Sequence, residues 1–319
     1  MAFNINTNTA AANAGFFLSR NNENLNKSMA RLASGKRVLS PADDAGGLAV
    51  AMKLQSSATR LVGARSNIQN AMSYLEVQDG VLETIGELVD RMSEIRALAN
   101  DIMKNDEDIQ TYNREFQDLQ VQLYDMAQEK FNEVSLFSTT TLKSGGNPVL
   151  FDGSYSQDNT MDLYISEDGE SGPIVSIHKA MLLSALTIDL TDPTDLKAGR
   201  FVDADQSTIL RFANPGIGGT GQEELLDLTE VSIGAFKQVL QNIAALRSQN
   251  GATMSRLDFS TDHVERKRNN LITAHSKIMD ADMAKESTNL ARDNVLVQSS
   301  ASMLSQANMI TEMALVLLR

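Results

Sequence analysis

The chain has 319 residues, a net charge of −13 and no cysteine. The charge argues against a general nucleic-acid binder, which needs a basic surface, and the lack of cysteine excludes disulfides, thiolate metal sites and cysteine nucleophiles. Only 5% of the residues are aromatic and none is Trp, so the composition favours long helices packed in bundles over a compact globular core, to which large aromatics contribute much of the area.

The first predicted helix lies near the N-terminus, where apolar residues follow a heptad with polar Asn22 at one seam position. Ser34-Gly35 is expected to end this helix. Ser40-Pro41-Ala42-Asp43-Asp44 then offers caps and a proline for the next one. The heptad positions are Ala11, Ala14, Leu18, Leu25, Met29 and Leu32.

Two further helices are predicted before residue 138. The polar run Asn105-Asp106-Glu107-Asp108 separates them, and Asp106 or Asp108 is expected to cap the second. Gln78 and Arg96 are polar interruptions in the first ladder, which runs Ile68, Ala71, Leu75, Leu82, Ile85, Val89, Met92, Ala99. The other runs Ile109, Tyr112, Phe116, Leu119, Leu123, Met126.

The middle of the chain, residues 138–222, has a different pattern. Short apolar or alternating pieces stand between Gly, Asp and Ser clusters, which predicts strands or hairpins. These pieces are Pro148–Gly153, Met161–Ile165, Ile174–Ile177 and Thr208–Phe212.

The C-terminal zone, residues 223–319, is again expected to be helical. One ladder runs Phe236, Val239, Ile243, Leu246 and, after a one-residue shift near Gly251, Leu257, Val264, Leu271, Ile278. The last runs Leu296, Ser300, Met303, Ala307, Ile310, Ala314, Leu317. The fold class predicted is mainly α, a long antiparallel helical bundle or coiled coil formed by the two terminal segments, with a small β-rich middle region.

The residues that suggest chemistry are few. Gly216–Gly221 matches G-x-G-x-x-G, but no βαβ pattern surrounds it and no acid follows at the ribose distance, so a flexible return into the C-terminal helices is favoured over nucleotide binding. His178, His263 and His275 have no helical or turn spacing for a metal site or triad. Asp43-Asp44 is expected to cap a helix rather than to act as a catalytic pair. No enzyme activity, cofactor or metal is therefore expected.

The C-terminal end is rich in apolar residues on more than one helix face. Met303, Ile310 and Leu317 lie on one face, and Leu304, Met313 and Val316 lie beside it. One partner helix from the same chain cannot cover both faces, which predicts burial between subunits. The alternative is a helix sunk in a single globular core, which the scarcity of aromatics disfavours.

Both ends of the chain resemble bacterial flagellins. The N-terminal motifs are Ile5–Asn8, Leu32-Ala-Ser-Gly-Lys-Arg-Val38, Asp43-Asp-Ala-Gly-Gly-Leu-Ala49, Asn70–Leu75, Glu83–Ile85 and Arg91–Ile95; the C-terminal ones are Arg256–Phe259, Ile278–Asp282, Ser302–Asn308 and Leu317–Arg319. The resemblance covers about 1–137 and 225–319.

The resemblance implies a structural subunit that polymerises into the extracellular flagellar filament and gives motility. Residues 1–40 with 283–319 would form an inner domain of terminal helices, 41–137 with 223–282 a helical rod, and 138–222 a β-hairpin and a small outward-facing region. Packing of the terminal helices within and between subunits is expected at Leu18, Leu25, Met29, Leu32, Leu296, Met303, Leu304, Ile310, Met313 and Leu317.

The same resemblance implies partners and a route. These are other copies in the filament, an export chaperone on the C-terminal helix, hook-associated and cap proteins, and a Toll-like receptor that would contact the rod surface at Arg91 and Glu115. No nucleic acid and no membrane span are expected. The residues alone suggest a soluble, cytosolic protein, because no cleavable signal is present; the resemblance replaces this with secretion by the flagellar type III route. The alternative function is a hook–filament junction protein, and a dinucleotide enzyme is the third class.

Overall fold

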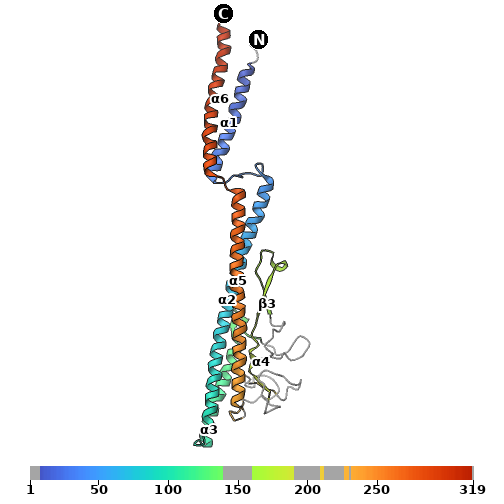
Figure 1. Ribbon diagram of the computed structural model, residues 1–319, viewed down its shortest axis with the longest axis vertical. Helices are drawn as coiled ribbons and strands as arrows, with labels where there is room; N and C mark the ends of the chain where they lie inside the picture. The colour runs from blue at the N-terminus through green and yellow to red at the C-terminus, as the bar shows by residue number, and fades with distance from the viewer. Residues whose placement is uncertain (1–7, 139–159, 190–208, 212–225, 230, 318–319) are drawn as a thin grey trace. The chain divides into compact units, whose positions relative to one another are not determined.

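The computed structural model describes residues 8–138, 160–189, 209–211, 226–229 and 231–317. Five long helices dominate it, and short α4 (Leu182–Leu186) lies in the middle region (Figure 1). This confirms the mainly α fold class. The long helices are α1 (Thr9–Ser34), α2 (Ala45–Ala99), α3 (Asp106–Ala127), α5 (Ile233–Met279) and α6 (Met283–Leu317).

The chain divides into two units, and α2 and α5 each contribute to both. The terminal unit consists of Met1–Thr59 and Lys267–Arg319, and the central unit of Arg60–Arg266. These divisions lie within α2 and α5. The predicted domain boundaries near residues 40 and 283 coincide with the breaks between α1 and α2 and between α5 and α6.

Two helix ends follow the predicted turn chemistry. Gly35 adopts φ +69°, a left-handed conformation that glycine takes without strain, and its N–H donates to the Arg31 carbonyl, which ends α1. The Asp44 carboxylate accepts a hydrogen bond of 2.7 Å from the Gly47 N–H at the start of α2. The predicted capping role is confirmed for Asp44, whereas Asp43 accepts from the Leu39 and Ser40 N–H groups and so closes the turn before the helix. These backbone bonds lower the pKa of Asp43.

The N-cap of α3 differs from the prediction. Asn105 is the cap: its side chain accepts from the Asp108 N–H at 2.8 Å, and the Asp108 carboxylate accepts from the Asn105 N–H in return. Asp108 is thus the reciprocal partner in a capping box rather than the cap itself. Asp106 lies in the first turn, where its negative charge favours the positive end of the helix dipole.

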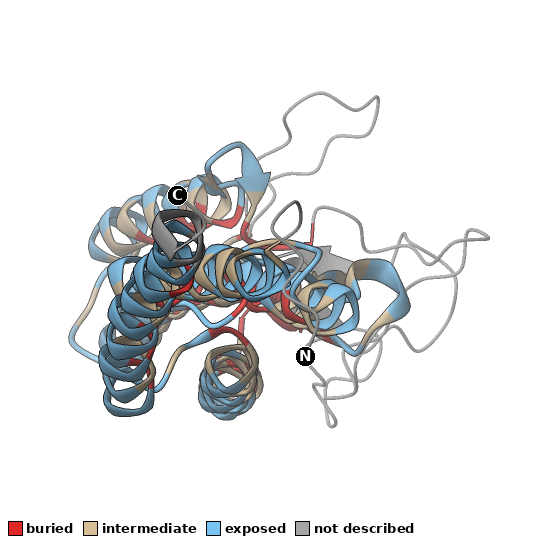
Figure 2. Cartoon of the chain, turned by 90° about the horizontal axis from the view of Figure 1, so that it is seen from above, coloured by how far each residue is buried: buried red, intermediate tan, exposed pale blue. Residues whose placement is uncertain are grey.

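The core of the central unit lies where α2, α3 and α5 meet. Figure 2 shows buried residues, in red, on the sides of helices that face other helices. Phe116 of α3 and Phe236 of α5 meet edge to face with ring centroids 6.1 Å apart. The largest fully buried side chains all belong to this unit: Leu61, Ile68, Leu75, Leu82, Ile85, Met92, Ile95, Phe116, Leu123, Phe137 and Phe236.

The polar interruption at Gln78 is also buried. Its side-chain amide donates to the carbonyl of Leu136, so this buried polar side chain has a hydrogen-bond partner. Across the helices, Arg247 binds Asp79 through two hydrogen bonds of 3.0 Å, and the Asn250 amide donates to the Leu75 carbonyl. These contacts fix the antiparallel register of α2 and α5.

The middle region holds short antiparallel pairs, as predicted. There β3 (Thr160–Tyr164) pairs with β4 (Ile174–His178). The hairpin of β1 (Lys130–Phe131) and β2 (Val134–Ser135) lies earlier, within residues 41–137, which were predicted to form the helical rod. Strand β5 (Thr187–Asp189) pairs with β6 (Ile209–Arg211), and a 3-10 turn, η2 (Gly169–Ser171), connects β3 to β4. The strand expected at 148–153 lies outside the described residues.

Candidate assembly interface

Helices α1 and α6 lie side by side in the terminal unit and run antiparallel (Figure 1). Polar groups bridge them along their length. The Asn21 amide donates to the Ser300 hydroxyl at 2.8 Å, and the Ser28 hydroxyl donates to the Asp293 carboxylate at 3.2 Å. Near the N-terminus of α1, the Asn8 amide donates to the carbonyl of Ala307. The seam is therefore held by polar contacts as much as by apolar packing.

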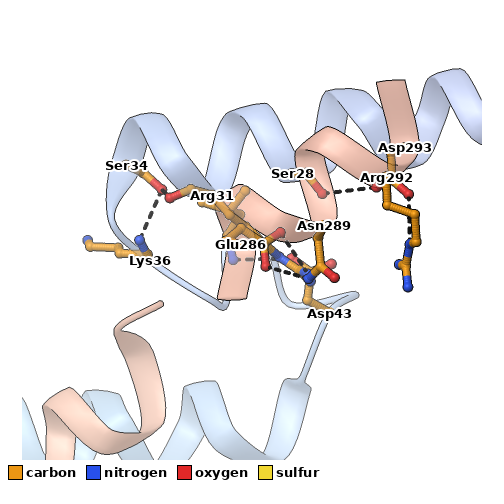
Figure 3. A network of polar contacts seen from close by, with 10 residues as sticks. Ser28, Arg31, Ser34, Lys36, Asp43, Glu286, Asn289, Arg292 and Asp293 are labelled. Atoms are coloured by element: carbon orange, nitrogen blue, oxygen red, sulfur yellow. Dashed lines mark hydrogen bonds and ion pairs between the residues drawn. The ribbon is translucent and has the colours of Figure 1, made fainter. Parts of the chain in front are cut away.

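The ion pair at one end of the seam is incomplete. Arg31 Nη1 and Glu286 Oε1 are 3.8 Å apart (Figure 3), too far for a hydrogen bond, although the Glu286 side chain is only 10% exposed. Glu286 Oε1 accepts no hydrogen bond from the described part of the chain, whereas Asn289 donates to its Oε2 at 3.2 Å. A buried carboxylate that is only partly satisfied weakens the helix pair.

The seam on α1 differs from the predicted heptad at two positions. It follows a strict three-four spacing through Ala11, Ala14, Leu18, Asn21, Leu25, Ser28 and Leu32. Asn21 rather than Asn22 is the polar seam residue, and Ser28, which is buried, takes the place expected for Met29. Met29 is 53% exposed beside the seam. The prediction was wrong there because it followed apolar side chains, while small polar residues occupy these two positions.

The predicted packing residues fall into two sets. Leu18, Leu25, Leu32 and Leu304 are half-buried in the seam. Met29, Leu296, Met303, Ile310 and Met313 are exposed, and the side chain of Leu317 lies outside the described ones. Further exposed apolar side chains on the same two helices, not singled out from sequence, are Phe16, Phe17, Met283, Val295 and Met309. The Phe16-Phe17 pair and the helical spacing of Val295 were the available signals for them.

The burial of apolar side chains in the terminal unit is correspondingly small. Among the described residues of this unit, the buried hydrophobic ones are Val38, Ala51, Ala58, Met279 and Ala307. Val38, Ala51 and Met279 cluster where the two helix connections meet, with the Arg37 N–H donating to the Met279 carbonyl and the Ala281 N–H to the Gly35 carbonyl. Many large apolar side chains thus lie on the outside of α1 and α6, while the seam between them combines half-buried leucines with small and polar residues. Exposed apolar surface of this kind marks an interaction site.

The two predicted rod-surface residues are close together in the central unit. Arg91 of α2 binds Glu115 of α3 through its Nη2 at 2.8 Å and its Nε at 3.0 Å, and its Nη1 lies 2.7 Å from Glu94. The hydrogen bonds that Arg91 donates to Glu115 are the main cause of a raised pKa of Arg91. Both side chains are exposed to solvent, so a binding partner can reach them.

The structure offers little for catalysis. No group of three or more His, Asp or Glu side chains among the described residues is placed to hold a metal ion. His178 is half-buried, and desolvation with the nearby Arg256 charge lowers its pKa. The glycine-rich motif at 216–221 lies outside the described residues. Nor does any described helix combine the length and apolar content needed to cross a membrane.

Long paired helices with exposed apolar faces define a class, that of helical structural proteins that associate. The model of the bacterial flagellin N-terminal helical region matches residues 5–141, and that of the bacterial flagellin C-terminal helical region matches residues 233–318. The chain belongs to the flagellin family, whose members are structural proteins of the flagellar filament and not enzymes.

Relatives are similar over almost the whole chain. The flagellin of Listeria innocua serovar 6a is 27% identical over 310 residues, 97% of each chain. The flagellin of Bacillus subtilis strain 168 is 28% identical over 331 residues, and the flagellar filament 33 kDa core protein of Treponema phagedenis is 26% identical over 321 residues, each covering 99% of both chains. These matches support a structural subunit of the flagellar filament and give no support to the hook–filament junction alternative.

Proposed function

We propose that this protein polymerises into an extracellular flagellar filament that gives motility, and that neighbouring subunits cover the outer faces of α1 and α6. One observation carries the proposal: among the side chains that the structure describes on these helices, ten large apolar ones are exposed, while small or polar residues fill much of the seam between them. Covering a large apolar side chain contributes roughly 1.5–3 kcal/mol. Partial covering of many such side chains favours association strongly.

The mechanism that this arrangement supports is folding coupled to polymerisation. A polar seam with an incomplete ion pair stabilises the pairing of α1 and α6 only weakly in a lone subunit. Isolated helices are themselves marginally stable in water. The central unit, with its phenylalanine and leucine core, is folded before assembly. On this basis, the breaks at 35–44 and 280–282 separate an inner domain of terminal helices from the rod.

Other partners would bind the terminal helices or the surface of the rod. An export chaperone would cover the apolar C-terminal helix before assembly, during secretion by the flagellar type III route. Hook-associated and cap proteins would meet the terminal helices at the two ends of the filament. A Toll-like receptor would contact the exposed Arg91–Glu115 pair, whose planar guanidinium and carboxylate offer directed hydrogen bonds. Family membership supports each of these.

A charge on the outer face of α6 tests the proposal. Ile310 is 49% exposed, so Ile310→Asp leaves the helix intact but places a carboxylate in a surface that is buried on assembly, at a cost of several kcal/mol. We expect a soluble subunit with unchanged helicity and at least a tenfold lower yield of sedimentable polymer. Ile310→Leu, which keeps the side chain apolar, is the matched control and should polymerise normally. Normal polymer from the Asp variant would contradict the proposal.

A further inference from the structure

Exposed methionines are concentrated on the helices of the proposed interface. On α6, Met283 is 50% exposed, Met303 65%, Met309 47% and Met313 60%, and on α1 Met29 is 53% exposed. Met52 and Met103 are exposed elsewhere. Met303, Met309 and Met313 lie closest together, within eleven residues near the end of α6. Buried methionines elsewhere are protected by packing: Met92 is fully buried in α2, and Met279 is 7% exposed. The chain has no cysteine and no Trp, so no more reactive thiol or indole competes with these thioethers for an oxidant.

We propose that Met303, Met309 and Met313 form an oxidation-sensitive site that controls assembly, an inference that rests on the proposed function. The oxidant is a peroxide. The thioether sulfur attacks one peroxide oxygen, the O–O bond breaks and an S–O bond forms; sulfur loses two electrons, and hydrogen peroxide is reduced to water. The product is methionine sulfoxide at each position.

Oxidation changes the chemistry of the α6 surface at these three points. A sulfoxide is polar and needs a hydrogen-bond donor, whereas the thioether is apolar and adapts to its neighbours. Met309 and Met313 stand four residues apart on one helix face, so their sulfoxides would enter the same contact. Burying them without donors opposes assembly. Because assembly covers the same side chains, free subunits are sensitive and finished filaments are resistant.

The test uses the full-length protein, treated with hydrogen peroxide before or after polymerisation. Peptide mass spectrometry locates the sulfoxides, and sedimentation measures polymer yield. In free subunits we expect oxidation at the three sites and at the other exposed methionines, Met29, Met52, Met103 and Met283, with Met92 and Met279 spared. Polymer yield should fall at least tenfold. Methionine sulfoxide reductase with dithiothreitol should restore it, since the chain has no disulfide for the thiol to reduce.

Variants separate the three sites from the rest. After peroxide treatment, the triple variant Met303→Leu, Met309→Leu, Met313→Leu should lose far less polymer yield than the parent protein. Met103→Leu, treated in the same way, should lose as much polymer yield as the parent protein. Met303→Leu alone should reduce the loss of polymer yield that peroxide causes. This single variant provides the test if the triple variant assembles poorly without peroxide.

The outcomes also separate this inference from the proposed function. Failure of the untreated protein to polymerise would refute the proposed function. Normal polymer from subunits with sulfoxides confirmed at all three sites would overturn the inference alone. So would a loss that the reductase does not reverse, or equal sensitivity of the Met303→Leu and parent proteins.

Discussion

The hairpin between β1 and β2 turns on two residues with positive φ, Asn132 at 48° and Glu133 at 66°. A two-residue turn of this kind requires the left-handed region at both positions, which suits Asn and Gly but strains a side chain such as Glu. We expect Glu133→Gly to raise the free energy of unfolding by about 0.5–1 kcal/mol, the relief of strain less the added entropy of glycine. Denaturant unfolding measures it. Asn132→Gly is the control and should gain less; a destabilised Glu133→Gly would contradict the turn geometry.

A second residue-scale prediction concerns Tyr74, which anchors the same hairpin. Its buried hydroxyl lies 2.9 Å from the Ser135 carbonyl and 3.1 Å from that of Leu136, and burial raises its pKa to about 12. A pKa raised from 10.0 in the folded state gives stability that is complete below pH 10 and is lost as pH rises through 12. Tyr74→Phe should cost about 1–2 kcal/mol at pH 8.

The pH dependence distinguishes this hydroxyl from a general packing effect. Because Phe cannot ionise, the difference in unfolding free energy between the parent protein and Tyr74→Phe should shrink between pH 10 and pH 12. Denaturant curves of both proteins at pH 8, 10 and 11 measure it. A difference that stays constant over this range would show that ionisation of Tyr74 does not couple to folding.

At the scale of elements, the polar seam between α1 and α6 limits their pairing. Replacing the opposed Asn21 and Ser300 by Leu puts apolar side chains at facing seam positions. Amide exchange of α1 and α6 in the isolated subunit should slow by roughly ten- to a hundredfold, which corresponds to about 1.4–2.7 kcal/mol. The matched control, Asn22→Leu with Ser299→Leu, lies outside the seam and should leave exchange unchanged. Equal slowing in both would contradict the seam register.

Sequence patterns predicted some elements fully and others only in part. The α2 ladder was correct down to its polar members Gln78 and Arg96, because its apolar positions repeat strictly and all meet a large-residue core. The α1 ladder failed at Asn21 and Ser28, since seam positions filled by small polar residues leave no apolar signal. The α3 cap was placed on an aspartate, although Asn105 caps equally well and only the backbone geometry decides.

The candidate site was predictable in kind but not in detail. Apolar residues on several faces of the C-terminal helix indicated association from sequence alone. Which of them lie in the seam and which lie outside depends on the partner helix: Leu304 faces the seam, whereas Met303 beside it is exposed. Phe16 and Met309 were missed because neither falls on the ladder that the sequence displays.

At the scale of the whole molecule, the two units differ in what stabilises them. The central unit buries large apolar side chains and satisfied polar ones, whereas the terminal unit buries few and exposes many. A stable core and marginal ends are the combination that lets a subunit remain unassembled until neighbours are present, since stability is not uniform across a structure. On the proposed function, assembly would supply the apolar burial that the terminal helices lack.

Hydrogen exchange on the isolated subunit and on the polymer tests this difference most directly. Amides of residues 9–34 and 290–317 should exchange rapidly in the lone subunit and become protected in the polymer, while those of the α2 and α5 segments within residues 60–266 should be protected in both. Full protection of both terminal segments in a subunit that is not associating would contradict it.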